Sequence, residues 1–482
     1  MVGLFSENGP CWIDVNGDVQ FNPYSWNNVS NMLWIDSPTQ VGFSYSNAVD
    51  GWIDPNSGYL TQTNGTCPDY APEGSCGTYS DGNYTLTANN TPAAAPNVWR
   101  TLQGFMGAFQ NYSRNGVHFA TESYGGHYGP VFATYFEDQN ANLPEGATEI
   151  KLLSLSINNG WYSPILQYPA YYEYMVNNTY NFRPLNQTIL DQFHDGMYGA
   201  GNCVDQLYAC NNGGADLECS NTDDYCYDLE ILYDTVTGRD EYDIRELLPD
   251  PYPYVNFPAY LNKPEVQQAI GAYVNFSYAS TNLGAGTVAN AFAATGDDSR
   301  ELGIMSELQT LLNDKGIYML HYAGDADYNC NWIGGEHVAD NLNVTGWCEA
   351  GYQNISTPDG VVHGVVKQSG NYSFARIYQS GHYVQFYKPL AALTMFDRVI
   401  HNLDVATGTV NVVDNSYKSV GPARSLLIND NSTIQMQVTD PSQTYNTVTN
   451  VPNPCPGNCS DDDPSTKKMI RKRSAKPNKL LM

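Results

Sequence analysis

The sequence His118-Phe-Ala-Thr-Glu-Ser-Tyr-Gly-Gly-His-Tyr-Gly-Pro130 joins a short apolar strand to a helical pattern through Ser123. A strand, a serine and a glycine two positions later are typical of a nucleophile elbow. Its tight turn exposes the serine hydroxyl and places the next backbone N–H at a helix N-terminus, where it can bind an oxyanion. The usual pattern is Gly-x-Ser-x-Gly, and Thr121 occupies the first glycine position here. On its own, the motif favours an ordinary serine in a surface turn.

Two later stretches supply the partners that a nucleophilic serine needs. Asp325 and Asp327 directly follow a predicted buried strand, and His382 lies in a loop between a predicted strand and a helix. Each stretch alone has an ordinary explanation. Asp325 and Asp327 could belong to a turn that caps the next helix, and His382 could be an ordinary loop residue. Together with Ser123 they follow the order Ser, Asp, His of the α/β-hydrolases, and they predict a catalytic triad.

Short apolar runs alternate with helical patterns along most of the chain. Strands are predicted where turn residues bound the runs, and helices where apolar residues recur at helical spacing. The predicted strands are 32–35, 117–120, 151–157, 317–322 and 374–377, and the predicted helices are 97–111, 128–136 and 389–400. Such alternation is typical of a mostly parallel sheet covered on both faces. The predicted fold class is α/β: an α/β-hydrolase fold with a mainly helical cap insertion and a small C-terminal extension.

Composition divides the chain into five segments. Residues 161–255 are rich in Tyr, Asn, Asp and Cys and show no strand pattern, which predicts a helical cap over the carboxyl edge of the sheet. The segments are a first core part at 1–160, the cap at 161–255, a second core part at 256–402, a β-rich extension and linker at 403–460, and a disordered charged tail at 461–482.

Two smaller features lie within these segments. Residues 60–95 are predicted to form a loop insertion closed by Cys67 and Cys76. Alternating Val and Thr at 407–413 and 432–438 predict the short strands of the extension.

The charge balance excludes two classes of partner. The 482 residues include 22 Lys and Arg against 50 Asp and Glu, for a net charge of −28. Nucleic acids and anionic membranes require clustered positive charge, so neither is expected as the main partner. No run of 18 or more apolar residues occurs, and a membrane span is therefore not expected. The basic tail is more simply a solvated end than a targeting or binding element.

Cysteines and glycosylation sequons indicate the secretory pathway. The 11 Cys cluster locally, which suits short-range disulfides, and their odd number leaves one thiol free or paired outside the chain. The Cys-x2-Cys pairs of a metal site are absent from the sequence. The sequence also contains thirteen Asn-x-Ser/Thr sequons, which together with the many cysteines indicate the secretory pathway. Residues 1–10 lack the features of a signal peptide, so we expect the natural protein to begin further upstream.

The sequence closely resembles the serine carboxypeptidases of the carboxypeptidase Y type from residue 3 to about 402. The motifs occur in the order and at the spacing of that family. The matching stretches are Gly3–Pro10, Asn22–Pro38, Val41–Tyr45, Glu122–Tyr128, Tyr322–Asp327, Cys330–Trp332 and Gly381–Val384.

The resemblance implies roles for the triad. Ser123 would be the nucleophile, His382 the general base and acid, and Asp327 the acid that orients the imidazole. Asp325 would support Asp327, and the Tyr124 N–H would be one oxyanion donor.

The resemblance also implies a substrate-binding set. Glu7 and Glu122 correspond to two adjacent carboxyl groups that help bind the C-terminal carboxylate of a peptide. Two carboxyls so close cannot both ionise cheaply, so one would keep its proton, which favours work at acidic pH. Tyr124, Cys330 and Tyr383 are expected to contact substrate as well. Neither a metal nor an organic cofactor is implied.

The chain departs from the family in several places. In the family, a Trp-Leu-Asn-Gly-Gly-Pro-Gly-Cys-Ser-Ser loop precedes the segment that begins here at Gly3, and it supplies a second oxyanion N–H. This chain begins after that loop, so we expect it to be truncated at the N-terminus and to have little activity in this form. Thr121, Tyr383 and Gln385 are milder departures that would reshape subsites.

The first interpretation is a secreted or vacuolar/lysosomal serine carboxypeptidase that acts on peptides. Two alternatives stay open: a family-related acyltransferase acting on a small molecule, and a non-catalytic or unfolded product of a truncated gene. The oligomeric state cannot be predicted from the sequence.

Overall fold

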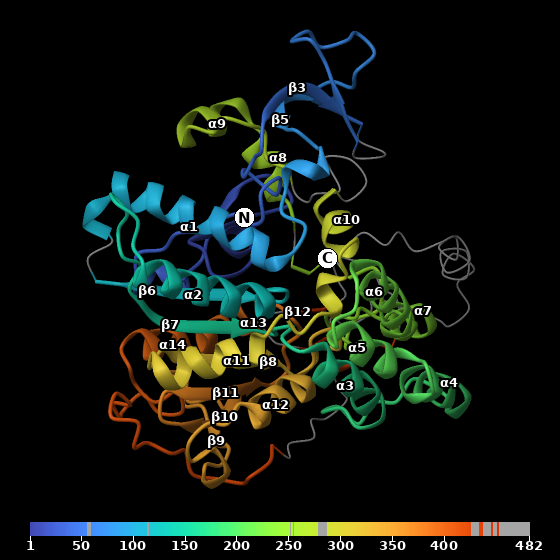
Figure 1. Cartoon of the computed structure of the whole chain (residues 1–482), viewed down its shortest axis with the longest axis vertical. Coiled ribbons are helices and arrows are strands. Elements are labelled where there is room, and N and C mark those ends of the chain that lie inside the picture. Colours follow the sequence, from blue (N-terminus) through green and yellow to red (C-terminus); the bar gives the residue numbers. More distant parts are fainter. Residues whose placement is uncertain are drawn as a thin grey trace.

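A six-stranded sheet lies at the centre of the computed structural model (Figure 1). Neighbours across the sheet are β6 (Val117–Glu122), β7 (Leu152–Asn158), β8 (Tyr318–Gly324), β11 (Tyr372–Ile377), β10 (Gly364–Ser369) and β9 (Gln353–Asn354). The first four strands are parallel, and β10 and β9 continue the sheet in antiparallel fashion. The predicted α/β class is therefore confirmed.

The structure describes most of the chain up to residue 425. The described residues are 1–425 apart from 55–58, 113–114, 251, 254 and 278–286, followed by 433–436, 445–446 and 451–452.

Helices cover both faces of the sheet. Alternate strand residues such as Leu155 and Met319 pack against α2 (Gly125–Ala141) and α12 (Trp332–Asn341) on one face. Residues of the opposite parity, including Leu320 and Ile377, pack against α14 (Pro389–Ile400) on the other. Because side chains alternate along a strand, each strand contributes to both cores.

The predicted elements of the core are present with small shifts in their bounds, with one exception. The helix predicted at 97–111 is α1 (Thr91–Ala108), which starts earlier because Asn90 caps it by accepting a hydrogen bond from the Ala93 N–H at 2.8 Å. The strand predicted at 32–35 is wrong. That segment forms no strand, and it lines a cavity beside β6 instead. An apolar run does not by itself distinguish a paired strand from a cavity wall.

The segment after β7 is helical, as the sequence predicts. It contains α3 (Pro164–Val176), α4 (Gln187–Tyr198), α5 (Cys203–Asn211), α6 (Asp216–Glu230) and α7 (Leu232–Thr237), which gather beside one end of the sheet (Figure 1). Two disulfides, Cys203–Cys226 and Cys210–Cys219, join α5 to α6. Its status as a separate cap stays a prediction.

The N-terminal region contains strands that the sequence did not suggest. A hairpin of β1 (Cys11–Ile13) and β2 (Val19–Phe21) precedes a three-stranded antiparallel sheet of β4 (Leu60–Gln62), β3 (Ala48–Ile53) and β5 (Cys76–Ser80). The predicted Cys67–Cys76 disulfide is present. Residues 60–95 are thus partly strand, because β3 supplies the pairing edge on both sides.

The extension differs from its prediction. Residues 407–413 do not form a strand, because the Asp404 carboxylate accepts hydrogen bonds from the N–H groups of Thr407, Thr409 and Val410 at 2.6–2.9 Å and holds them in a turn. Segment 432–438 lies largely outside the described residues. Further along the chain the structure describes β12 (Tyr445–Asn446) and β13 (Val451–Pro452), which pair with each other. The tail 461–482 lies wholly outside them.

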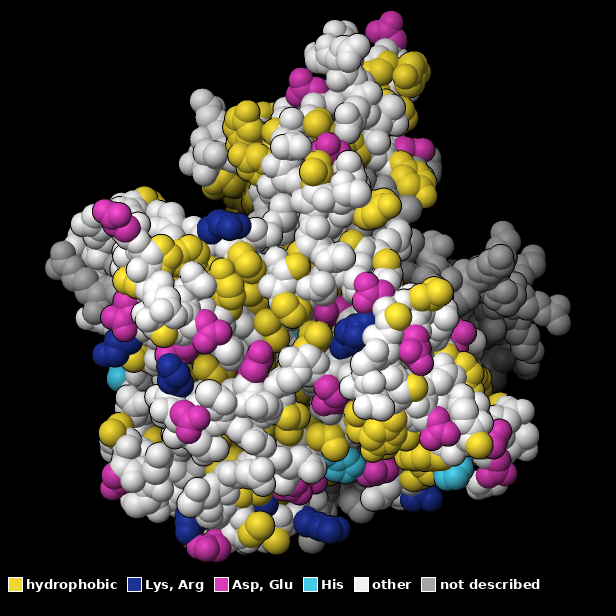
Figure 2. Space-filling model, viewed as in Figure 1, with side chains coloured by type: hydrophobic (Ala, Val, Ile, Leu, Met, Phe, Trp, Pro, Cys, Tyr) yellow, Lys and Arg dark blue, Asp and Glu magenta, His cyan; other side chains and the backbone are white. Residues whose placement is uncertain are grey.

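Surface and cysteine chemistry agree with the composition. Figure 2 shows Asp and Glu side chains scattered over one face among few Lys and Arg. Within the described residues, no helix combines the length and apolar character needed to cross a bilayer. Three described cysteines, Cys11, Cys330 and Cys348, are outside disulfides, and Cys455 and Cys459 lie beyond the described residues. The odd number of cysteines had implied one thiol that is either free or paired outside the chain.

The first turn of α2 touches the segment that follows β7 at Gly126. A Cβ atom there would lie 2.3 Å from the Trp161 carbonyl oxygen, too close for any side chain. We expect Gly126→Ala to lower stability by about 1–3 kcal/mol through overpacking, measured as a lower unfolding temperature. The matched control is Gly104→Ala on α1, where nothing lies within 4 Å of the added Cβ. It should stabilise slightly, by up to about 1 kcal/mol, through helix propensity. Equal effects of the two changes would contradict the close packing.

Candidate active site

Ser123 sits in the tight turn between β6 and α2. Its φ is +61°, a left-handed conformation that a serine adopts only when neighbours enforce it. The Ser123 N–H donates to the Asn158 carbonyl at 3.0 Å, and its carbonyl accepts from the Trp161 N–H at 2.9 Å. The end of β7 and the segment just after it therefore fix the turn from both sides, which is the geometry of a nucleophile elbow.

The unusual Thr121 is accommodated by its own hydroxyl. Thr121 Oγ1 donates to the Gly125 carbonyl at 2.9 Å. A Cβ on Gly125 would come within 2.5 Å of the Thr121 Cβ, so the threonine is compatible only with glycine at position 125. The departure from Gly-x-Ser-x-Gly leaves the turn intact.

Tyr124 follows the nucleophile position and caps α2. Its N–H lies at the helix N-terminus, where backbone N–H groups have no partner inside the helix and can bind negative charge. Its hydroxyl donates to Asp297 Oδ2 at 2.7 Å. Burial, followed by the Asp297 charge, raises the pKa of the Tyr124 hydroxyl well above its usual value of 10, so that it stays a donor.

His382 and Asp327 form a buried pair. His382 Nδ1 lies 2.7 Å from Asp327 Oδ2, and both side chains are inaccessible to solvent. The same oxygen accepts hydrogen bonds from Asn159 Nδ2 at 2.6 Å and from the Cys330 N–H at 3.2 Å. Burial alone would lower the pKa of His382. The Asp327 charge and hydrogen bond outweigh that effect, and they raise the His382 pKa above its usual 6.5.

Asp325 braces the loops around this pair without touching the imidazole. Its Oδ1 accepts from the Tyr180 hydroxyl at 2.8 Å and from the Gln379 N–H at 2.7 Å, and Arg376 lies beside it. The Gln379 contact ties Asp325 to the loop that leads to His382. The structure thus places Asp327, not Asp325, against the histidine.

Ser123 and His382 line one cavity of about 1440 Å³. In the described structure, the Ser123 hydroxyl makes no hydrogen bond to the imidazole. Such bonds are often long in a site without substrate and shorten on binding. The predicted residues Glu7, Tyr124 and Tyr383 line the same cavity.

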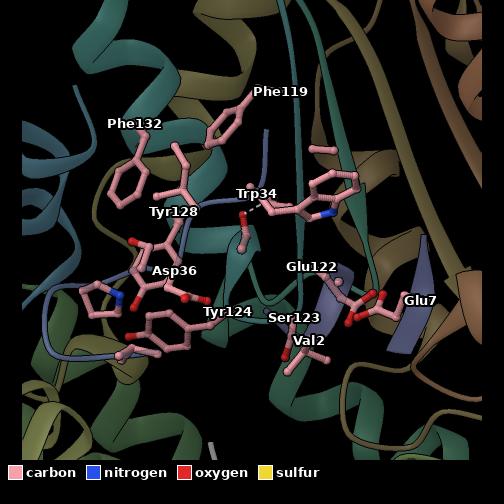
Figure 3. Close-up of a pocket in the computed structure, with 18 of the residues that line it drawn as sticks. Val2, Glu7, Trp34, Asp36, Phe119, Glu122, Ser123, Tyr124, Tyr128 and Phe132 are labelled. Carbon is pink, nitrogen blue, oxygen red and sulfur yellow. Dashed lines mark hydrogen bonds between the residues drawn. The ribbon is translucent and has the colours of Figure 1, made fainter. Parts of the chain in front are cut away.

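Glu7 and Glu122 face one another beside Ser123 (Figure 3). Glu122 Oε2 accepts hydrogen bonds from Asn158 Nδ2 at 2.6 Å and from Gln385 Nε2 at 3.2 Å. Burial, then the neighbouring Glu122 carboxylate, raises the pKa of Glu7 well above its usual 4.5. This pair can offer one protonated carboxyl as a hydrogen-bond donor.

Two polar residues of the site were missed by sequence reasoning. Asn158, which ends β7, bonds to Glu122, and the next residue, Asn159, bonds to Asp327. Gln385, which the sequence marks as a departure that would reshape subsites, bonds to Glu122. Consecutive asparagines at the carboxyl end of a buried parallel strand were the available signal, because such ends gather at one edge of the sheet. Cys330, which was predicted, is buried and lines the cavity wall.

Comparisons with known proteins agree with this geometry. Carboxypeptidase S1 of Penicillium janthinellum is 34% identical over 84% of this chain and 86% of its own length. Carboxypeptidase S1 homolog B of Arthroderma otae is 34% identical over 89% of this chain and 70% of its own length. The crystal structure of Kex1(delta)p, a prohormone-processing carboxypeptidase from Saccharomyces cerevisiae, has the same fold, with a TM-score of 0.62 at 20% identity over 84% of this chain and 80% of that one. The serine carboxypeptidase family matches residues 1–402, and this chain belongs to that family.

Proposed function

We propose that this protein is a serine carboxypeptidase that releases C-terminal residues from peptides through an acyl-enzyme. The observation that carries the proposal is the Glu7–Glu122 carboxyl pair beside Ser123, in the cavity that His382 also lines. A protonated carboxyl next to a nucleophile suits a substrate that ends in a carboxylate, whereas an acyltransferase needs no such pair. Family membership favours the same activity over an inactive product.

In the first half-reaction, Ser123 Oγ attacks the carbonyl carbon of the last peptide bond. Its proton passes to His382 Nε2, while the Asp327 carboxylate holds the Nδ1–H and stabilises the imidazolium. The Tyr124 N–H donates to the oxyanion of the tetrahedral intermediate. His382 then returns the proton to the leaving amine, the C–N bond breaks, and the C-terminal amino acid departs.

In the second half-reaction, water attacks the ester carbonyl of the acyl-enzyme. His382 accepts a proton from that water and gives it to Ser123 Oγ as the C–O bond breaks, which releases the shortened peptide. Both halves use the same groups.

The carboxyl pair would select peptides with a free C-terminus. Glu7 in its protonated form donates to one carboxylate oxygen of the substrate, and an ionised pair would repel the same group. His382 must be neutral to act as a base, so its raised pKa limits activity at low pH. Work at acidic pH, as the sequence suggests, stays a prediction.

We infer that the protein passes through the secretory pathway and is then secreted or held in a vacuole or lysosome. Of the 11 sequon asparagines among the described residues, nine are exposed, and three disulfides are formed. Treatment of the native protein with a peptide-N-glycosidase should lower its mass. An unchanged mass would count against this location.

The activity is tested with a blocked dipeptide carrying either a free or an amidated C-terminus. We expect kcat/KM to be about 10- to 100-fold higher for the free form, the worth of a charge-assisted hydrogen bond. Ser123→Ala should lower kcat by several orders of magnitude, and Asp327→Asn by about 10,000-fold. Asp325→Asn is the matched control at the neighbouring carboxylate, with a smaller loss. Unchanged turnover in Ser123→Ala would refute the proposal.

The Glu7 carboxyl predicts the pH dependence of substrate binding. Its pKa is raised, so Glu7 is a neutral donor below that pKa and becomes an anion as the pH rises through it. KM for the free dipeptide should therefore rise on the alkaline side, while KM for the amidated one stays flat. Glu7→Gln keeps a neutral donor at every pH and should flatten the first curve. A curve of unaltered shape in Glu7→Gln would assign the titration to another group.

A further inference from the structure

The extension that begins at residue 403 lies outside the segment matched by the family, which ends at residue 402. It is nevertheless tied to the core of the fold. The Ser419 and Pro422 carbonyls accept hydrogen bonds from the N–H groups of Gly351 and Tyr352 at 2.9 and 2.7 Å, directly before β9. The proposed reaction assigns no task to this part of the chain, so its contacts with the active site need an explanation.

Ser425 of the extension reaches a buried arginine beside the triad. Arg376 Nη1 donates to Ser425 Oγ at 2.8 Å, and Arg376 Nη2 lies 3.9 Å from Asp325 Oδ2. The Arg376 side chain is 1% exposed. Asp325 Oδ1 in turn accepts from the Gln379 N–H at 2.7 Å, on the loop that leads to His382. A chain of contacts therefore joins Ser425 to the histidine loop.

Gln435 reaches the active site by a second route, through residues 239–247, which we call the bracing loop. The Gln435 N–H donates to the Arg245 carbonyl at 2.7 Å, and Gln435 Oε1 accepts from the Leu247 N–H at 2.7 Å. The Gln435 carbonyl accepts from Arg239 Nη2, also at 2.7 Å. Gln435 is 4% exposed, so these groups would be costly to leave without their partners. The extension is thus firmly attached to the bracing loop.

The bracing loop contacts both loops of the catalytic pair. The His382 N–H donates to the Tyr242 carbonyl at 2.8 Å, and the Tyr242 ring lies edge-on to the imidazole with the ring centroids 5.0 Å apart. The Ile244 N–H donates to the Ala326 carbonyl at 2.9 Å, in the loop of the triad acid. A Cβ atom on Gly381 would lie 2.5 Å from the Tyr242 carbonyl oxygen. A shift of the bracing loop would therefore displace the groups that carry out the reaction.

Bonds within the bracing loop make it stiff. Arg245 is fully buried, and its Nε lies 2.8 Å from Asp243 Oδ1 in the same loop. Arg239 Nη1 donates to the Arg245 carbonyl at 3.3 Å, and Arg239 forms an antiparallel bridge with Leu247. The loop is held as a unit by these contacts, so a change on the side that faces the extension is transmitted to the side that faces the histidine.

We propose that Ser425 and Gln435 are positioning residues, through which the extension holds the loop of His382 in its catalytic geometry. This inference rests on the proposed carboxypeptidase function and adds a segment to its machinery. Both residues belong to the described part of the chain, and neither lines the cavity that contains Ser123. Their loss should therefore lower kcat and leave KM nearly unchanged. A misplacement of about 1 Å can cost about 100-fold in rate.

The first experiment measures kcat and KM of Gln435→Met with the blocked dipeptide that has a free C-terminus. Methionine is similar in size, but its thioether is only a weak acceptor for the Leu247 N–H. We expect kcat to fall about 10- to 100-fold at an almost constant KM. The rate is divided by the amount of Ser123 that an organophosphonate titrates to completion, so unfolded protein is not counted. Gln187→Met makes the same change at an exposed position of α4 and should leave both constants unaltered.

Two gentler variants keep the test decisive if Gln435→Met folds poorly. Gln435→Glu retains an oxygen that can accept from the Leu247 N–H, and the adjacent Arg239 guanidinium balances its charge. Its kcat should stay close to that of the unaltered protein. Ser425→Ala removes one hydroxyl from the Arg376 contact and should lower kcat by about 2- to 10-fold.

A spectroscopic measurement separates positioning from a general loss of structure. The proton between His382 Nδ1 and Asp327 Oδ2, which are 2.7 Å apart, should give a proton NMR resonance far downfield of the amide signals. Gln435→Met should shift or broaden this resonance. Gln435→Glu and Gln187→Met should leave it in place, because the bracing loop keeps its support in both.

Failure of this inference can be told from failure of the proposed function. An unaltered kcat in both Gln435→Met and Ser425→Ala, or a change confined to KM, would overturn the positioning role and leave the carboxypeptidase proposal standing. A kcat for Gln435→Glu as low as that of Gln435→Met would also overturn it. Absence of hydrolysis by the unaltered protein, in a preparation with native secondary structure, would refute the proposed function itself. The downfield resonance would then still decide whether Gln435 holds the catalytic pair.

Discussion

Two consecutive asparagine side chains at the end of β7 hold the site together. Asn158 Nδ2 donates to Glu122 Oε2, to the His382 carbonyl and to Gln385 Oε1 at 2.6–3.1 Å. Asn159 Nδ2 donates to Asp327 Oδ2 and to the Cys330 carbonyl, and its Oδ1 accepts from the Gly324 N–H at 3.0 Å. Both side chains are buried, where each unmade hydrogen bond would be costly, so their partners are held in place.

This arrangement explains how distant parts of the chain meet at one edge of the sheet. The Asn158 carbonyl also fixes the Ser123 N–H, so one short stretch of β7 touches the nucleophile turn, the carboxyl pair and the histidine–aspartate pair. Parallel neighbours β6, β8 and β11 end at the same edge and deliver those groups. The left-handed backbone at Ser123 is strained, and it persists because the surrounding hydrogen bonds hold it in place.

Much of this could be predicted from the sequence because it follows local patterns. Ser123, Asp327 and His382 follow the carboxyl ends of β6, β8 and β11, and strand ends in a parallel sheet converge, so their meeting could be expected from order alone. Asn158 bonds to His382 and Asn159 bonds to Asp327, partners more than 160 residues away that no local pattern reveals. At residues 407–413 the local pattern was misleading. The alternating Val and Thr predict a strand, but the Asp404 carboxylate holds this segment in a turn.

The presence or absence of a neighbouring strand explains the other differences between the predicted and observed strands. The apolar run 32–35 has strand-like composition but no strand beside it, whereas the less apolar β4 pairs because β3 offers an edge. Composition measures how well a residue fits a pleated surface, and it does not report whether such a surface is within reach.

The helices beside the sheet have two different roles: α3 supports the loops of the triad, and α6 lines the cavity. Tyr174, at the end of α3, and Tyr180 hydrogen-bond to Asp325 and so brace the loops of the triad. The carboxyls of α6 face the cavity instead, on a helix that two disulfides fasten to α5. Substitutions on that face of α6 would alter the cavity wall, while the hydrogen bonds to Asp325 and the two disulfides would persist. The wall of the cavity and the supports of the His382–Asp327 pair can thereby vary separately within one chain.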